Sequence, residues 1–190
     1  MILVIDTSSS WAVVATIDGR HTTLQFIPSR DPALIAELRR IARVRTVTKV
    51  AVATGPGSFT GLRKGVSFGL GLAMGLRIPI VPLPTLELQA ARSAEPVTAI
   101  SEAGRGRFYY LLPGGQLGLG EPAEIPTSHP LVGRRLMTAE AVFERAGHRF
   151  KPESELRPFP EAAAELLKTA REVPYDSLKL EYMQTFSASK

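Results

Sequence analysis

One glycine-rich run, from Gly55 to Gly75, holds the residue types and spacing most suggestive of chemistry. Repeated glycines and hydroxyl residues after an apolar strand are typical of loops whose backbone N–H groups bind phosphate. A P-loop needs a glycine five residues after its first glycine, followed by Lys and Ser or Thr. Thr60 stands at that distance from Gly55 and Leu62 from Gly57, so the run is not a P-loop.

Two other active-site signatures fail in the same segment. The dinucleotide-binding fingerprint needs a glycine where Thr60 stands, and the nucleophile elbow needs glycines where Pro56 and Thr60 flank Ser58. The chain has no cysteine, which excludes a disulfide framework, thiolate metal ligands and a cysteine nucleophile. The histidines are isolated from one another in the sequence and form no metal-ligand pattern: His21, His129 and His148. We therefore expect no metal site and no familiar catalytic motif.

The glycines continue into a predicted helix, where they need an explanation. Each glycine costs about 1 kcal/mol relative to alanine in a helix interior, so some other interaction must offset that cost. Gly61, Gly65 and Gly69 are four residues apart, and Ala73 continues the row. Residues at this spacing share one helix face, and their small side chains form a smooth groove that another backbone can approach closely.

Two kinds of partner fit this groove, and the pattern leaves both open. The glycine row could pack on the chain's own sheet, or it could pair with a helix of another subunit. A second, apolar row lies beside the glycines on the same helix, formed by Phe59, Leu62, Val66 and Leu70. Because both rows need cover, we expect one to face the sheet and the other to face a partner.

The elements that must position this helix begin with a three-stranded meander. Residues 2–5 are an apolar run closed by the small polar turn 6–10, as expected of a buried strand. Residues 11–17 and 21–27 flank Asp18-Gly19, a two-residue turn that favours an antiparallel hairpin.

Crossover connections follow the meander. Asp31 is a predicted N-cap with proline next to it, and apolar residues recur at helical spacing up to residue 44. The next predicted elements are a strand at 49–54, a helix from the 55–57 turn to about residue 76, a strand at 78–81 and a helix at 85–94. This order predicts an α/β lobe over residues 1–95, with a mixed sheet covered by helices.

A second, reduced lobe is predicted over residues 96–190, with a C-terminal segment able to pack back on the first. Its pattern is short and less regular. Its predicted strands and helices are 97–100, 107–112, 138–146 and 160–171.

Composition limits the class of protein. The 190 residues are 44% hydrophobic, enough for a packed core, and the formal net charge of +5 is spread along the chain. The N-terminus lacks the basic flank and long apolar region of a signal peptide, and Arg and Pro interrupt every apolar run. We therefore expect a cytoplasmic protein without membrane contact.

Several motifs together resemble the TsaB (YeaZ) family. They are Ile5-Asp-Thr-Ser8, Gly55-Pro-Gly-Ser-Phe-Thr-Gly-Leu-Arg63 and Ile78-Pro followed by Pro84-Thr-Leu-Glu87, with a weaker echo at Leu180-Glu-Tyr-Met-Gln184. The resemblance covers mainly the first half. It implies the actin-like ATPase (ASKHA) superfold, with two ribonuclease-H-like lobes of mixed sheets and a degenerate second lobe. One departure is Ser101-Glu-Ala103, where the family usually has Asp-Ala-Arg.

The same resemblance implies a function. It is a non-catalytic partner in forming N6-threonylcarbamoyladenosine (t6A) at adenosine 37 of tRNA, dimerising with the catalytic paralogue TsaD and joined by the ATPase TsaE. The chain is expected to need no cofactor, since the partners use ATP and Mg²⁺, to meet tRNA through the complex and to homodimerise when alone. The resemblance favours the intermolecular use of the glycine helix, with interface residues Phe59, Gly61, Leu62, Gly65, Val66, Gly69, Leu70 and Ala73.

The alternative is an ATP-dependent kinase or ATPase of the same superfold. Asp6 stands where this superfold directs a carboxylate toward nucleotide phosphates and Mg²⁺, with Thr7 and Ser8 as hydroxyl donors. Active members have a glycine in this turn, which here reads Thr7-Ser-Ser-Ser10. We therefore interpret Asp6, Thr7 and Ser8 as a vestigial phosphate site and leave weak nucleotide binding open.

Overall fold

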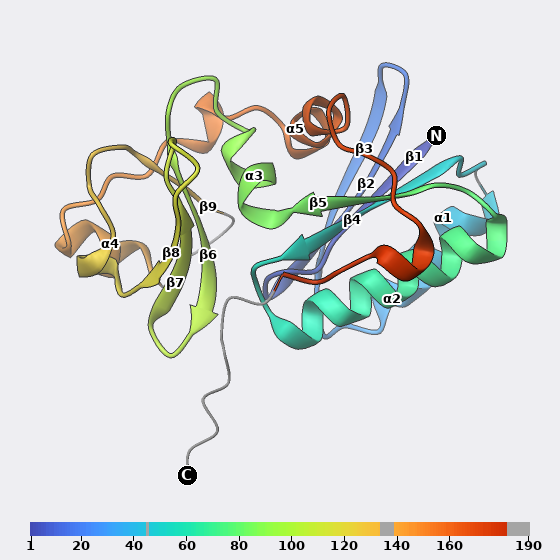
Figure 1. Ribbon diagram of the computed structural model, residues 1–190, viewed down its shortest axis with the longest axis horizontal. Helices are drawn as coiled ribbons and strands as arrows, with labels where there is room; N and C mark the ends of the chain where they lie inside the picture. Colours follow the sequence, from blue (N-terminus) through green and yellow to red (C-terminus); the bar gives the residue numbers. More distant parts are fainter. Residues whose placement is uncertain (45, 134–138, 182–190) are drawn as a thin grey trace, which may run out of the picture.

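Two β-sheets lie side by side in the computed structural model, which describes residues 1–44, 46–133 and 139–181 (Figure 1). The first sheet has the strand order β3-β2-β1-β4-β5. β1, β2 and β3 form the predicted antiparallel meander, whereas β4 and β5 run parallel to β1 and to each other. The strands are β1 (Ile2–Asp6), β2 (Trp11–Asp18), β3 (His21–Pro28), β4 (Lys49–Gly55) and β5 (Ile80–Pro84).

Helices cover both faces of this sheet because strand side chains alternate between its faces. On one face, β1 and β4 side chains such as Ile5 and Val52 pack with Leu38 of α1 (Ala33–Val44) and with Val66 of α2 (Phe59–Leu76). On the other face, Val4 packs with residues of α5 (Phe159–Leu166). The predicted mixed sheet covered by helices is confirmed.

The second sheet repeats the topology of the first on a smaller scale. Its strand order is β8-β7-β6-β9, and each strand has the same neighbours and relative direction as its counterpart in β3-β2-β1-β4. The described residues contain no counterpart of β5 in this sheet. Where the first lobe has α1 between its third and fourth strands, this lobe has the 3-10 helix η1. These elements are β6 (Thr98–Gly104), β7 (Arg107–Leu111), β8 (Leu117–Gly120), η1 (Pro122–Glu124) and β9 (Leu131–Gly133).

α3 (Thr85–Ala90) connects the two sheets and contacts both. It ends earlier than the predicted 85–94 because the next N–H groups reach back three residues rather than four, from Arg92 to Gln89 and from Ser93 to Ala90. α5 ends earlier than the predicted 160–171 in the same way, at Lys168 and Thr169.

The remaining short elements belong to the second half. α4 spans Glu140–Arg145 within the predicted 138–146, whose first residue, Thr138, lies outside the described residues. Two further 3-10 helices, η2 (Glu153–Glu155) and η3 (Tyr175–Ser177), precede and follow α5. No helix in the described part of the chain combines the length and the apolar character that a membrane span requires.

The chain returns to the first lobe after the second sheet. Beyond α5, residues 173–181 run along the outer edge of β5 and beside α2, and we call them the C-terminal strap (Figure 1). The Val173 N–H donates to the Ile80 carbonyl at 3.1 Å, and the Glu181 N–H donates to the Thr54 carbonyl at 2.9 Å. Residues 159–181 therefore pack with the first lobe although they follow the second in sequence.

Candidate protein interface and inter-lobe cavity

The first glycine row of α2 faces the chain's own sheet. A Cβ added at Gly61 would lie under 3.0 Å from the backbone oxygen of Thr7, and one at Gly65 equally close to the Thr7 hydroxyl oxygen. A Cβ at Gly69 would collide with a methyl group of Val52 on β4. The Thr7 hydroxyl also donates to the Gly61 carbonyl at 2.7 Å. The absent side chains let α2 lie directly on the turn after β1 and on β4.

The predicted use of this row as a groove for another subunit is therefore wrong. Six of the eight predicted interface residues are buried within their own lobe: Gly61, Leu62, Gly65, Val66, Gly69 and Ala73. Leu70 is partly buried against the same core, and only Phe59, 40% exposed, points clearly to solvent. The close backbone approach inferred from the spacing does occur, but the chain's own turn after β1 makes it.

A second row of small residues lies on the opposite side of α2. Ser67, Gly71 and Gly75 are again four apart, and Ser67 and both glycines are exposed. A Cβ added at Gly71 or Gly75 would meet no atom within 4 Å. Nothing in the described part of the chain offsets the helix cost of these two glycines. The same four-residue spacing was visible in the sequence, but sequence reasoning assigned only the inward row.

Apolar side chains flank the second row. Phe59 and Met74 are 40% and 53% exposed, and the Arg63 guanidinium stacks over the Phe59 ring at 3.7 Å from its centre. We call this surface the outer face of α2, comprising Phe59, Arg63, Ser67, Gly71, Met74 and Gly75. Figure 1 shows α2 along the outside of the first lobe. An exposed helix face of this composition matches the close-approach surfaces that small residues provide between helices.

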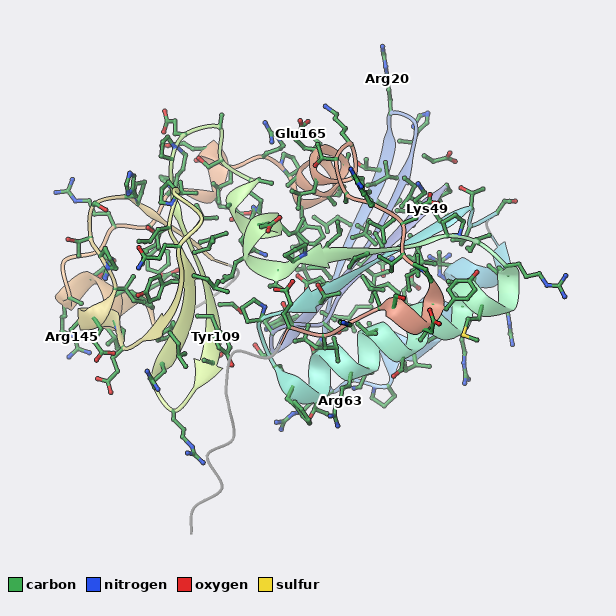
Figure 2. The ribbon with its side chains drawn as sticks, viewed as in Figure 1. Arg20, Lys49, Arg63, Tyr109, Arg145 and Glu165 are labelled. Atoms are coloured by element: carbon green, nitrogen blue, oxygen red, sulfur yellow. The ribbon has the colours of Figure 1, made fainter. Side chains whose placement is uncertain are left out.

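A cavity of about 840 Å³ lies between the lobes. Its walls come from the turn after β1, the end of β3, the start of α2 and the ends of β6 and β7. The Lys64 ammonium donates to the Ser29 carbonyl at 2.6 Å on one wall. Tyr109 on the opposite wall is 6% exposed, and burial raises the pKa of its hydroxyl. Figure 2 labels Tyr109 on the second sheet and Arg63 near the start of α2.

The predicted phosphate-binding residues separate in the structure. Asp6 is fully buried, and its carboxylate accepts the Ser8 N–H at 2.8 Å, which shapes the turn. Thr7 is buried and its hydroxyl is bonded to α2. Of the three, only Ser8 lines the cavity, and it is 2% exposed. The expectation that Asp6 and Thr7 face a ligand is wrong because both side chains serve the contact between the turn and α2.

The remaining charges in the cavity are of mixed sign. Glu102 and Glu181 line it together with Arg30 and Lys64. Glu102 belongs to the altered Ser101–Ala103 segment, which therefore lies at this cavity. Among the described residues, no group of three or more His, Asp or Glu side chains could hold a metal ion.

Comparison with known proteins shows which families the chain is similar to. A family model described as "TsaD: tRNA N6-adenosine threonylcarbamoyltransferase" matches residues 30–121. The "tRNA threonylcarbamoyladenosine biosynthesis protein TsaB" of Bacillus subtilis is 41% identical over 120 residues, which cover 50% of this chain and 52% of that protein. The protein of the same name from Escherichia coli is 35% identical over 69 residues, 34% of this chain and 30% of that protein. Over about half of its length the chain is therefore similar to TsaB (YeaZ) proteins.

Solved structures show that the chain shares the fold of YeaZ proteins. YeaZ from Pseudomonas aeruginosa superposes with a TM-score of 0.65 at 24% identity, covering 96% of this chain and 99% of that chain. A second structure, described as an uncharacterized protein with similarity to peptidase YEAZ from Pseudomonas aeruginosa, gives 0.70 at 22% identity with the same coverage. The ASKHA fold with two ribonuclease-H-like lobes is thereby confirmed. The sequence matches to TsaB proteins span about half or less of those proteins, and the family-model match over residues 30–121 includes α2. Residues 182–184 of the motif echo lie outside the described residues.

Proposed function

We propose that this chain is a non-catalytic subunit of the machinery that makes t6A in tRNA, and that it pairs with a TsaD-like subunit through the outer face of α2. The outward row of Ser67, Gly71 and Gly75 carries the proposal. These residues have small side chains or none, so they leave the helix backbone accessible, and no other part of the described chain covers them. The names of the TsaB relatives supply the reaction, and the bare surface supplies the physical means of taking part in it.

The side chains of the first turn support a helper role over catalysis. In the kinase or ATPase alternative, the Asp6 carboxylate acts on a nucleotide. Here that carboxylate is buried and accepts a backbone N–H, and the neighbouring Thr7 hydroxyl is bonded to α2. Releasing either group would break the contact that fixes the start of the helix. We infer that the ATP and Mg²⁺ of the reaction are used by a TsaE-like ATPase and the TsaD-like subunit.

The same face supports a homodimer in the absence of the partner. In a twofold dimer each copy contributes the same surface, so the outer face would pack on itself, glycine row against glycine row. Phe59 and Met74 at the margins would then lose their exposure to water. tRNA would meet this chain only as part of the complex.

The test compares one substitution at two exposed glycines. Gly71→Leu is expected to abolish co-elution with the purified TsaD-like subunit in size-exclusion chromatography, because a leucine side chain would hold the two helices apart. The variant should stay folded, since the position has open space around it. Gly114→Leu is the matched control, because Gly114 lies far from α2 and also has nothing within 4 Å.

Two results would contradict the proposal. One is pairing of the Gly71→Leu protein at unchanged affinity, which would remove the outer face from the interface. The other concerns the kinase alternative. Micromolar binding of ATP and Mg²⁺ to the isolated chain by calorimetry, lost in Asp6→Ala but with the fold intact, would favour catalysis instead.

A further inference from the structure

A cavity of about 560 Å³ lies at the free edge of the first sheet, apart from the outer face of α2. Its walls are the ends of β4 and β5, α3, the end of α5 with the residues that follow it, and the C-terminal strap. Figure 1 shows the strap passing outside β5 on its way to α2. The volume lies within the range of small-molecule sites, so the space suits a ligand.

Proline residues explain why this space is open. β4 and β5 pair in parallel, and the Val50 N–H donates to the Pro79 carbonyl. Backbone groups alternate between the two edges of a strand, so those of the next residue, Ile80, and of every second residue after it point away from β4. Ile80 uses this outward position to accept the Val173 N–H. The next outward residue, Pro82, has no N–H, so the strap cannot continue as a sixth strand. The strap next bonds to the sheet at Glu181, and the cavity fills the interval.

Three hydrogen-bond acceptors in this cavity lack a partner among the described residues. Glu87 and Glu181 line it, and neither carboxylate has a hydrogen bond or ion pair within the part of the chain that the structure describes. Partial burial raises the pKa of Glu181, and the negative charge of Glu87 raises it further. Thr54 also lines the cavity, is 1% exposed, and its hydroxyl oxygen is buried without a partner among the described residues. A cationic donor would satisfy all three groups.

The apolar part of the wall selects the kind of cation. Leu83, Leu166 and Ala170 lie beside the carboxylates, and they suit the methylene chain of an amine. A divalent metal ion needs about six oxygen ligands, and two carboxylates with one hydroxyl do not supply that shell. Arg171 and Lys179 also line the cavity, but neither forms an ion pair with a described residue. Both could compete with a bound cation for the two carboxylates.

We propose that this cavity binds an alkylammonium group on an aliphatic chain, with Glu87 and Glu181 holding the charge and Thr54 accepting an N–H. The ammonium could belong to a polyamine or to a lysine side chain of another protein. The proposal does not depend on the role in tRNA modification, because no residue of the outer face of α2 takes part.

The experiment uses the full chain and titrates cadaverine by calorimetry, with Nα-acetyl-lysinamide as a second probe. Glu181→Gln and Glu87→Gln are each expected to weaken cadaverine binding about fivefold or more, the effect of removing one partly exposed ion pair. Glu144→Gln is the matched control, because it removes the same charge from α4 in the second lobe. Tighter binding of cadaverine would assign the site to a polyamine, and tighter binding of the lysine derivative would assign it to a protein side chain.

The pH dependence gives an independent measurement. Because the ammonium stabilises the charged form of Glu181, binding lowers its raised pKa and releases protons. The affinity for cadaverine should therefore increase as the pH rises through the pKa of Glu181 in the free protein. Glu181→Gln should flatten that increase. The other charged groups lining the cavity are Glu87, Arg171 and Lys179.

The chain's own cations provide the opposing test. If Lys179 competes for the carboxylates, Lys179→Ala should strengthen cadaverine binding. The proposal is overturned if cadaverine does not bind at millimolar concentration, or if an equal concentration of K⁺ displaces it. It is also overturned if both glutamine variants bind as tightly as the unaltered chain.

Discussion

The two sides of α2 carry the same residue type at the same spacing for opposite reasons. On the inner side, Gly61, Gly65 and Gly69 make room for atoms that are present, because the turn after β1 and the Val52 side chain occupy the space a Cβ would need. On the outer side, Gly71 and Gly75 face open space. A row of small residues therefore indicates close approach, but it does not say which neighbour approaches.

The difference has an energetic consequence. An inner glycine has its helix penalty of about 1 kcal/mol offset within the folded chain, because the helix gains contact with the sheet. An outer glycine has the same penalty, and nothing in the part of the chain that the structure describes offsets it. Its compensation must come from a contact outside the described chain, which is the physical basis for assigning the interface to the outer face.

The largest expected effect is on the inner side. Gly61→Ala adds one methyl group where the Thr7 carbonyl oxygen lies, and a backbone atom fixed in the turn cannot move aside. We expect a loss of about 2 to 3 kcal/mol in the free energy of unfolding, as for overpacking in a core. Urea denaturation followed by circular dichroism measures it. An unchanged or higher midpoint would mean that the inner row does not set the distance between helix and turn.

A smaller loss is expected from the hydrogen bond that crosses the same contact. Thr7→Val keeps the shape of the side chain but removes the hydroxyl that donates to Gly61 at 2.7 Å. The Gly61 carbonyl remains part of the helix but loses this additional donor, which costs about 1 kcal/mol. Thr60→Val on the exposed start of α2 is the control, and its free energy of unfolding should change by less than about 0.5 kcal/mol. Equal shifts in the two variants would show that the Thr7 bond contributes nothing specific.

Local patterns in the sequence predict most of the first lobe. The Asp18-Gly19 turn and the apolar runs on either side define the meander, and the spacing of Leu34, Leu38 and Ile41 defines α1. These signals lie within a few residues of each other, so no knowledge of distant contacts is needed. The second lobe is different: β8 is a four-residue strand with two glycines and β9 has three residues, too short for an alternating pattern.

The direction in which each side of α2 points could not be predicted in the same way. The residues that decide it, Thr7 and Gly61, are 54 positions apart in the sequence. Hydrophobicity also misleads here, because the inner row of glycines is no more apolar than the outer one. The buried state of Asp6 was missed for a related reason, since its carboxylate bonds within the turn instead of facing the cavity.

The smallest effect, and the one with the opposite sign, is expected on the outer side. Gly71→Ala adds the same methyl group as Gly61→Ala but meets no atom, so only the gain in helix propensity remains. The isolated chain should become more stable by about 0.5 to 1 kcal/mol, measured by the same urea denaturation. If the outer face pairs with a second helix, this stabilised variant should bind its partner more weakly, because even a methyl group separates the two backbones. Stabilisation with undiminished pairing would leave Gly71 outside the close contact and shift the interface toward Phe59 and Met74.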